Sequence, residues 1–279
     1  MDMVSLEAKS QRESGAWRAL VELPRHSNLI LSLTKRELLA RYRSSALGPI
    51  WAIITPAMMI AIYTFIFAGV FGARFGASGS KWSYALYLFC GLLPWTAFQE
   101  SAQTSANTIV AHSNLVKKVI FPLETLPVAH ALAALGNQLY GTVALLAATL
   151  AIQREGHLTW LWFPLLLLPQ ALLMLGVSWF IASLGVYVRD TAQALGLVLT
   201  AWFFLTPVVY PETVVPQRYR PLIDLNPFTA LVRNHRRIFL DGMEPEWGGL
   251  VYASAVATII FVGGYWWFAR TRKGFADVI

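Results

Sequence analysis

The side chains that could do chemistry in this chain are basic, aromatic and small polar groups, and they form no catalytic motif. No GxxxxGK[ST] segment is present, so the sequence has no loop of the kind that holds the phosphates of ATP. HExxH, CxxC and GxSxG segments are also missing, and the five histidines show no metal-ligand spacing. We therefore expect no catalytic residue, no metal site and no cofactor in this chain itself.

Residues 29–43, LILSLTKRELLARYR, hold the first basic cluster, which comprises Lys35, Arg36, Arg41 and Arg43. At about 100° per residue, an apolar side of this segment separates from a charged side. The apolar side consists of Leu31, Leu38, Leu39 and Tyr42. A basic amphipathic helix of this kind is expected to lie flat in a membrane interface.

Residues 105–123, SANTIVAHSNLVKKVIFPL, hold the second basic cluster, Lys117 and Lys118. An uncharged polar stretch leads into a short helix-like piece. Phe121-Pro122 is expected to end it, because proline disfavours helix at the residue before it. The segment is too short for a domain. It fits either a surface element docked into a partner or a basic loop that anchors the membrane side.

Aromatic side chains are concentrated in two apolar runs, one around Pro94 and one before Pro211. The residues of interest are Trp95, Phe98, Trp202, Phe204 and Tyr210. Aromatic rings suit the C–H faces of sugars, so these residues are candidates for the lining of a glycan path. The alternative is that they belong to the belts that Trp and Tyr form at membrane interfaces.

Other polar or small residues within the apolar runs have simpler structural explanations. A helix-packing hydrogen bond explains His130 better than a proton relay, and Glu100 is expected to be paired or to reach toward the membrane surface. A secondary transporter would show more buried ionisable groups than this chain has. Four small residues are expected to pack helices: Gly176, Ser178, Ala182 and Gly185.

The elements that must position these groups are six apolar runs. Of the 279 residues, 56% are hydrophobic and 13% are charged, whereas a soluble domain carries about 25% charged residues. Each run is long enough for a spanning helix, so we expect an all-α integral membrane fold with six transmembrane helices. The runs are Ala46–Phe71, Trp82–Gln99, Thr125–Ile152, Leu158–Val188, Thr191–Pro211 and Trp247–Ala269.

The placement of Lys and Arg predicts the orientation. With the N-terminus inside, the cytoplasmic segments hold 14 of these residues and the outer segments hold 8, so both termini are expected in the cytoplasm. Residues 1–28 contain no apolar run typical of a signal peptide. The net charge of +7 does not indicate nucleic acid, because in a membrane protein the position of the charge matters more than its sum.

The expected organisation has three parts. Residues 1–45 form a cytoplasmic segment with the amphipathic helix, residues 46–270 form the transmembrane domain, and residues 271–279 form a cytoplasmic tail. The fifth loop, Glu212–Glu246, mixes apolar patches with balanced charges. It fits an ordered external cap or helices that re-enter the membrane over about 211–246, with a solvated loop as the alternative.

Several segments resemble the membrane subunits of ABC-2-type exporters of polysaccharide, which serve O-antigen, capsule and teichoic acid. They occur in the family's order and cover most of the chain from Leu29 to Phe239, whereas the first 28 residues find no counterpart. The segments are RELLARYRSSALGPIWAIITP (36–56), YTFIF (63–67), GLLPWTAF (91–98), NLVKKVIFP (114–122), VRD (188–190), TPVVYP (206–211) and LNPFTALV (225–232).

The resemblance implies a homodimer in the bacterial inner membrane, paired with two copies of a separate ABC ATPase that binds ATP and Mg²⁺. It implies that the helix around Lys35–Arg43 is an interface helix and gate. It also implies a coupling helix within about 105–121 and re-entrant helices in the fifth loop. The ATPase-contacting residues would be Ser113, Asn114, Leu115, Lys117, Lys118 and Phe121.

In the O-antigen branch of that family the cargo is a glycan on undecaprenyl pyrophosphate, moved from cytoplasm to periplasm. Arg36, Arg41 and Arg43 could then pair with the pyrophosphate. Two other functions remain open from the sequence. One is an ABC-2 exporter of another lipid or hydrophobic cargo, and the other is an ion-coupled carrier, which would need no ATPase.

Overall fold

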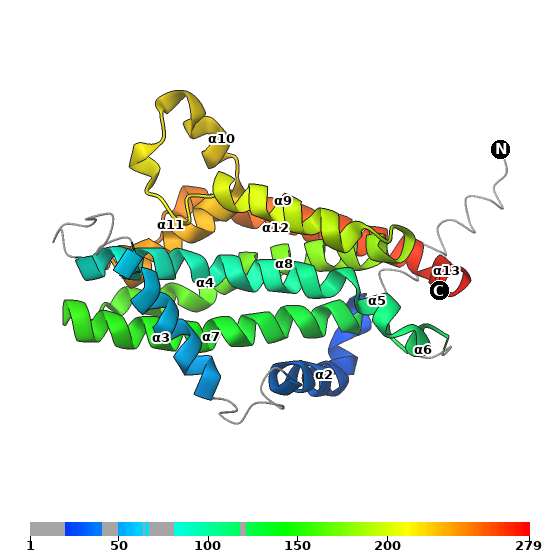
Figure 1. The fold of residues 1–279 in the computed structure, drawn as a ribbon. Coiled ribbons are helices and arrows are strands. Elements are labelled where there is room, and N and C mark those ends of the chain that lie inside the picture. The colour runs from blue at the N-terminus through cyan, green and yellow to red at the C-terminus, as the bar shows by residue number, and fades with distance from the viewer. Residues whose placement is uncertain (1–19, 41–49, 64, 67–80, 118–120) are drawn as a thin grey trace.

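The computed structural model describes residues 20–40, 50–63, 65–66, 81–117 and 121–279, apart from some side chains within 52–63 and 81–83, and these residues form helices joined by turns. Figure 1 shows the longest helices side by side along one axis. They are α4 (Lys81–Ala106), α7 (Thr125–Gln153), α8 (Phe163–Tyr187), α9 (Thr191–Leu205) and α12 (Trp247–Thr271), and the shorter α3 (Trp51–Tyr63) runs at an angle beside them.

The remaining helices are shorter and lie mostly at the two ends of this bundle (Figure 1). Near one end lie η1 (Leu23–His26), α2 (Ser27–Ala40), α5 (Thr108–Ala111), α6 (Ser113–Val116), η7 (Arg272–Gly274) and α13 (Phe275–Val278). Toward the other lie η4 (Leu158–Trp162), η5 (Glu212–Val214), η6 (Gln217–Tyr219), α10 (Arg220–Asp224) and α11 (Pro227–Phe239). We call these the inner end and the outer end.

Three stretches of the described chain are long and apolar enough to cross a membrane: Thr125–Gln153, Leu158–Tyr187 and Trp247–Val278. α9 is apolar but has only 15 residues, and α4 has 26 residues with a polar second half. α3 covers 13 residues of the first predicted span. The expected all-helical fold with apolar helices is confirmed, and the count of six spans stays a prediction.

Local sequence explains where helices begin and end around the fifth loop. Asn226 caps α11, since its side-chain oxygen accepts a hydrogen bond from the Phe228 N–H at 3.0 Å, and Pro227 suits the first helical position. α9 ends at Leu205 because Pro207 disfavours helix at Thr206. The fifth predicted run, drawn to Pro211, was therefore too long.

Small residues bring the long helices into close contact. A side chain on Gly176 or Gly264 would collide with the backbone of the facing helix. The backbones of α8 and α12 are therefore in direct contact at these two glycines. Gly185 meets the backbone of Ala106 in the same way. Ser178 and Ser101 hydrogen-bond at 2.8 Å between their hydroxyls. The prediction that such small residues pack helices is confirmed.

α2 packs against α7 by a side other than most of its predicted membrane-facing side. Ile30, Leu33 and Thr34 are its buried residues, and the Leu38 methyl groups lie against Gly136 of α7. Leu31 and Leu39 are exposed instead. The predicted apolar side is therefore largely open, and its contact with a membrane interface stays a prediction. Tyr42 lies outside the described residues.

The predicted tail at 271–279 packs onto the inner end of the bundle. Phe275 is fully buried against Tyr187 and Phe268. Arg272 Nη1 contacts both carboxylate oxygens of Glu124, at 3.0 and 3.1 Å. The C-terminus thus braces the start of α7.

Candidate functional site

The second half of α4 carries a polar face that stays open in the described part of the chain. It is formed by Thr96, Gln99, Glu100, Gln103 and Thr104, and Asn107 continues it directly after the helix ends. Gln99 and Glu100 are partly exposed and the other four are exposed. These residues recur every three or four positions, so they share one side of the helix. The opposite side, with Ala97, Phe98 and Ala102, is buried.

Hydrogen bonds hold the two central side chains of this face. The Trp95 indole Nε1–H donates to Gln99 Oε1 at 3.0 Å. Asn137 of α7 donates from Nδ2 to Glu100 Oε1 at 3.3 Å, so Glu100 has a partner, as the sequence predicted. The face is therefore an ordered set of hydrogen-bonding groups.

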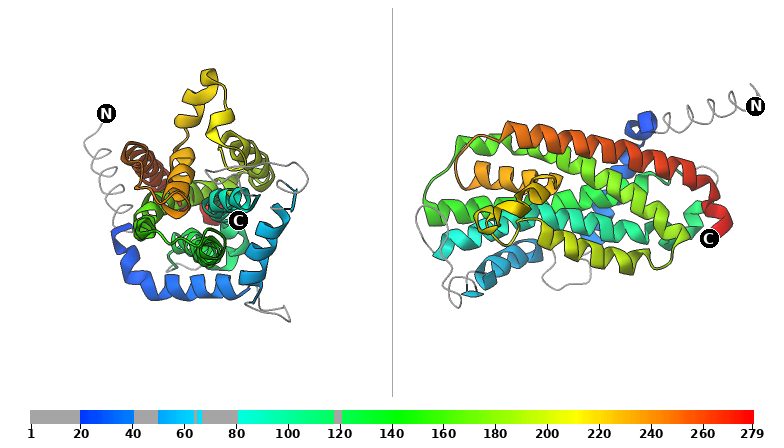
Figure 2. Two further views of the ribbon diagram at one scale, coloured as in Figure 1. Left: turned by 90° about the vertical axis from the view of Figure 1, so that its left-hand side faces the viewer. Right: turned by 90° about the horizontal axis from the view of Figure 1, so that it is seen from above.

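α3 and α9 both pack against α4, and Figure 2 shows these two helices on different sides of it. The exposed side chains of these two helices are mainly apolar, and they include Met58, Met59, Ile62, Leu197, Val198, Phe204 and Leu205. Amide and carboxylate groups are costly to place against hydrocarbon. The polar face consequently requires water or another protein surface opposite it, whereas its apolar flanks do not.

An aromatic cluster lies on the buried side of α4. The ring centroids of Trp95 and Phe228 are 5.2 Å apart, and those of Phe98 and Trp202 are 5.1 Å apart. Trp95 and Phe98 are fully buried, so they belong to the core of one protomer.

The other predicted path residues are more open. Trp202 is partly buried and donates its indole N–H to Asn226 Oδ1 at 3.0 Å. Phe204 is 60% exposed, and the Tyr210 hydroxyl donates to the Phe204 carbonyl at 2.8 Å. A role of all five aromatic residues in a glycan path stays a prediction.

The predicted ATPase-contacting segment forms two single-turn helices, α5 and α6, after α4 ends at Ala106. Its exposed residues are Asn107, Val110, Ala111, Asn114 and Lys117, which we call the docking stripe. Leu115 and Phe121 pack instead against an apolar cluster of the bundle, and Ser113 is half-buried. Lys118 lies outside the described residues.

Arg36 is the described member of the basic cluster predicted to meet pyrophosphate. It is exposed, with Nη2 at 3.4 Å from Glu37 Oε1 and 3.5 Å from His112 Nε2. Arg41 and Arg43 lie outside the described residues.

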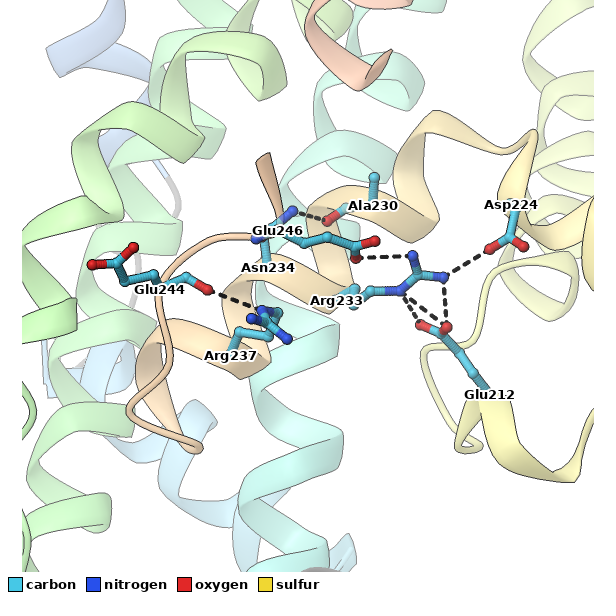
Figure 3. A network of polar contacts seen from close by, with 8 residues as sticks. All are labelled: Glu212, Asp224, Ala230, Arg233, Asn234, Arg237, Glu244 and Glu246. Atoms are coloured by element: carbon cyan, nitrogen blue, oxygen red, sulfur yellow. Dashed lines mark hydrogen bonds and ion pairs between the residues drawn. The ribbon is translucent and has the colours of Figure 1, made fainter. Parts of the chain in front are cut away.

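At the outer end, Arg233 of α11 joins three segments of the chain (Figure 3). Its guanidinium contacts Glu212 at 2.6 Å, Asp224 at 2.8 Å and Glu246 at 3.0 Å. The hydrogen bonds to Glu212 raise the pKa of Arg233, against an opposing effect of partial burial. A cleft of about 350 Å³ opens beside it, lined by Glu212, Thr213, Val215, Arg220, Ile223, Asp224 and Arg233.

Arg236, one turn further along α11, is buried and is held by backbone carbonyls. It donates to the carbonyl of Pro207 at 2.7 Å, of Val208 at 2.6 Å and of Tyr87 at 3.3 Å. Its guanidinium carbon lies 3.6 Å from the centre of the Tyr87 ring, a cation–π contact. α11 is thereby pinned to α4 and to the turn after α9. The orientation predicted from Lys and Arg places Arg233 and Arg236 on the outer side, where basic residues are less common. Both residues have partners within the chain.

Comparison with known proteins identifies the family to which the chain belongs. The sequence profile of the family described as ABC-2 type transporter matches residues 28–240. The chain belongs to this family. The chain is also similar to O-antigen export system permease proteins RfbA from Myxococcus xanthus and Klebsiella pneumoniae. The first is 30% identical over 94% of this chain and 99% of the relative, and the second is 27% identical over 90% and 95%.

A third relative of this ABC-2 family member is the polysialic acid transport protein KpsM of Escherichia coli. It is 24% identical over 83% of this chain and 89% of the relative. The family suggested by the resemblance is confirmed.

Sequence reasoning missed the polar face of α4 and part of the docking stripe. The face had a visible signal, since Thr96, Gln99 and Gln103 recur at helical spacing directly after an apolar run. The sequence did not indicate that Val110 is exposed, because a valine in a short segment is equally compatible with a buried position. Arg236 gave no signal either, since its acceptors are backbone carbonyls as many as 149 positions away.

Replacing Arg236 by Met is expected to destabilise the fold strongly, because it removes the donor to the buried carbonyls of Pro207 and Val208. At about 1–3 kcal/mol for each unsatisfied group, the free energy of unfolding should fall by about 2 kcal/mol or more. Denaturant titration in detergent micelles measures this. Arg237→Met is the matched control, since Arg237 makes one hydrogen bond, to the Glu244 carbonyl, and should lose about 1 kcal/mol. Equal losses in the two variants would refute the role assigned to Arg236.

Proposed function

We propose that two copies of this chain form the membrane path of an ATP-driven exporter of lipid-linked polysaccharide. The cargo is most consistent with an O-antigen on undecaprenyl pyrophosphate, moved from cytoplasm to periplasm. The observation that carries the proposal is the exposed polar face of α4, a helix that packs against α3 and α9, whose exposed side chains are mainly apolar. The printed functions of the relatives, O-antigen export and polysialic acid transport, support the same class of cargo.

The chemistry of the polar face suits a passing glycan. Gln99, Gln103 and Asn107 each offer an amide donor and an amide acceptor, and Thr96 and Thr104 add hydroxyls. Such groups exchange hydrogen bonds readily with sugar hydroxyls and water, without concentrating charge. Glu100 is the single formal charge of the face. In our proposal Phe204 and Tyr210 of the neighbouring segment add the aromatic contacts.

A second copy of the chain would complete this path. The exposed apolar residues of α9, such as Leu197 and Val198, suit a contact between copies that places two polar faces opposite each other. The polar faces would then line water rather than lipid, as their chemistry requires. In this arrangement the chain spans the bacterial inner membrane six times, with both termini in the cytoplasm and α10–α11 near the periplasmic exit.

The motor is a separate ABC ATPase, present in two copies, which binds ATP and Mg²⁺. The docking stripe at the inner end supports this part of the proposal, since it presents Val110 and Ala111 between the polar Asn107, Asn114 and Lys117. An apolar centre with a polar rim is typical of a protein interface. α2 would be the interface helix, with Arg36, Arg41 and Arg43 near the entrance for the pyrophosphate.

An ABC-2 exporter of another lipid or hydrophobic cargo would share the family, and we regard it as the alternative. The polar face of α4 favours a hydrated cargo over an apolar one, since an apolar cargo gains nothing from amide groups. An ion-coupled carrier is disfavoured by the family assignment.

Cysteine labelling tests whether the polar face borders water. Native Cys90 is fully buried, so the wild type should be nearly silent toward a membrane-impermeant charged maleimide. Thr96→Cys and Gln103→Cys should react in inverted membrane vesicles, because a thiol in water forms the reactive thiolate. The measurement is the labelled fraction by mass shift.

Val143→Cys is the matched control for this labelling. Val143 is 66% exposed on α7, in an apolar setting expected to face lipid, where a thiol stays protonated and unreactive. Labelling of Thr96→Cys and Gln103→Cys no greater than that of Val143→Cys would contradict a water-filled path.

Val110→Arg is expected to abolish retention of the ATPase, because it places a charge at the apolar centre of the docking stripe. The measurement is co-purification of the ATPase from detergent extracts. Val214→Arg is the control, since Val214 is also exposed but lies at the outer end. Full retention of the ATPase by Val110→Arg would rule out the docking stripe as the contact.

A further inference from the structure

We call residues 107–117, which contain α5 and α6, the docking segment. Two polar contacts that meet at one residue connect α2 to the beginning of this segment. The helix lies across the inner end of the bundle, close to α5 and α7 (Figure 1). Apolar packing seats it there, through Ile30 and Leu33 in a cluster that also contains Ile109 of α5. The polar contacts add a specific attachment to this seat.

The first contact runs from Glu37 through His130 to Thr108. Glu37 Oε2 lies 3.8 Å from His130 Nδ1, and His130 Nε2 lies 2.9 Å from the hydroxyl oxygen of Thr108. Thr108 is the first residue of α5 and is buried. The ring of His130, on α7, thus bridges α2 and α5.

The second contact runs from Arg36 through His112 to the same threonine. His112 Nδ1 lies 2.8 Å from the Thr108 carbonyl, which can only accept, so Nδ1 carries the proton. The other ring nitrogen, Nε2, lies 3.5 Å from Arg36 Nη2. His112 lies between α5 and α6, inside the docking segment.

Thr108 therefore receives both contacts, one on its hydroxyl and one on its carbonyl. Asn107, directly before it, and Val110, two positions after it, belong to the docking stripe. A displacement of the docking stripe by a partner would move Thr108, and with it the two rings that hold Arg36 and Glu37. The path from stripe to α2 is short and contiguous, as energetic coupling between two elements requires.

We propose that His130 and His112 are positioning residues that tie the interface helix to the ATPase-docking segment through Thr108. They transmit the movement of the docking segment to α2 and are not needed for binding of the ATPase itself. This inference rests on the proposed function, because it assumes that an ATPase drives the docking segment.

The test uses proteoliposomes that contain the chain with its ATPase and the lipid-linked polysaccharide of the source strain. Two quantities are measured: the rate of ATP hydrolysis, and the polysaccharide transported for each ATP hydrolysed. Thr108→Val and His130→Phe should leave hydrolysis and ATPase retention near wild type. The polysaccharide transported per ATP should fall about fivefold or more, the lower end of a typical coupling effect.

Matched variants separate coupling from general stability. Thr108→Ser keeps the hydroxyl but removes the methyl group, and its transport per ATP should be near wild type. If the methyl group mattered instead, through packing, Thr108→Ser would lower the ratio. Thr149→Val removes a buried hydroxyl of α7 that bonds to the Leu145 carbonyl of its own helix, away from the docking segment, and should leave the ratio unchanged. Glu37→Gln keeps the size of a partly exposed side chain, and it should lower the ratio without loss of folding.

A double variant tests whether the residues act in one contact. Glu37→Gln combined with His130→Phe should lower transport per ATP no further than His130→Phe alone. Additive losses, an unchanged ratio in Thr108→Val and Glu37→Gln, or loss of ATPase retention in these variants would each overturn the inference. Absence of ATP-driven transport by the wild type would instead overturn the proposed function, and the inference with it.

Discussion

The structure depends first on the burial of one guanidinium group at the outer end of the bundle. Arg236 has donors that must be satisfied away from water, and it finds the carbonyls of Pro207, Val208 and Tyr87. Those carbonyls belong to the turn after α9 and to α4, so this single side chain fixes three elements together. α11 then delivers Phe228 to the aromatic cluster with Trp95, which orients the indole that holds Gln99. The order of the polar face of α4 follows from this chain of contacts.

The two ends of the bundle differ in how their polar groups are used. At the outer end, Arg233 and Asn234 are held by partners within the chain, whereas Arg154, Arg218 and Arg220 are exposed. At the inner end, polar groups are exposed on the second half of α4 and on the docking stripe. In our proposal the inner end is the one that meets the ATPase.

Much of the fold was accessible from the sequence, because long apolar runs leave few alternatives. The run Thr125–Ile152 differs from α7 by a single residue, and the helical nature of the fifth loop was foreseen among its alternatives. The side of α2 that packs against α7 could not be predicted from the sequence, since leucines lie on two sides of this helix. The burial of Trp95 and Phe98 was also missed, because aromatic composition does not reveal which face of α4 meets α11. Contacts such as Arg236 with Tyr87 join residues too distant in sequence for any local pattern to show them.

The most direct measurement is the location of the polysaccharide in cells that lack this chain but keep its ATPase and the enzymes of polymer synthesis. We expect lipid-linked polymer to disappear from the cell surface and to accumulate inside, protected from a polymer-degrading enzyme until the inner membrane is permeabilised. The wild-type chain should restore surface polymer, whereas a chain with Gln99, Glu100 and Gln103 all changed to Leu should not. Normal surface polymer in the deletion strain, or full restoration by the triple variant, would contradict a polysaccharide path along α4.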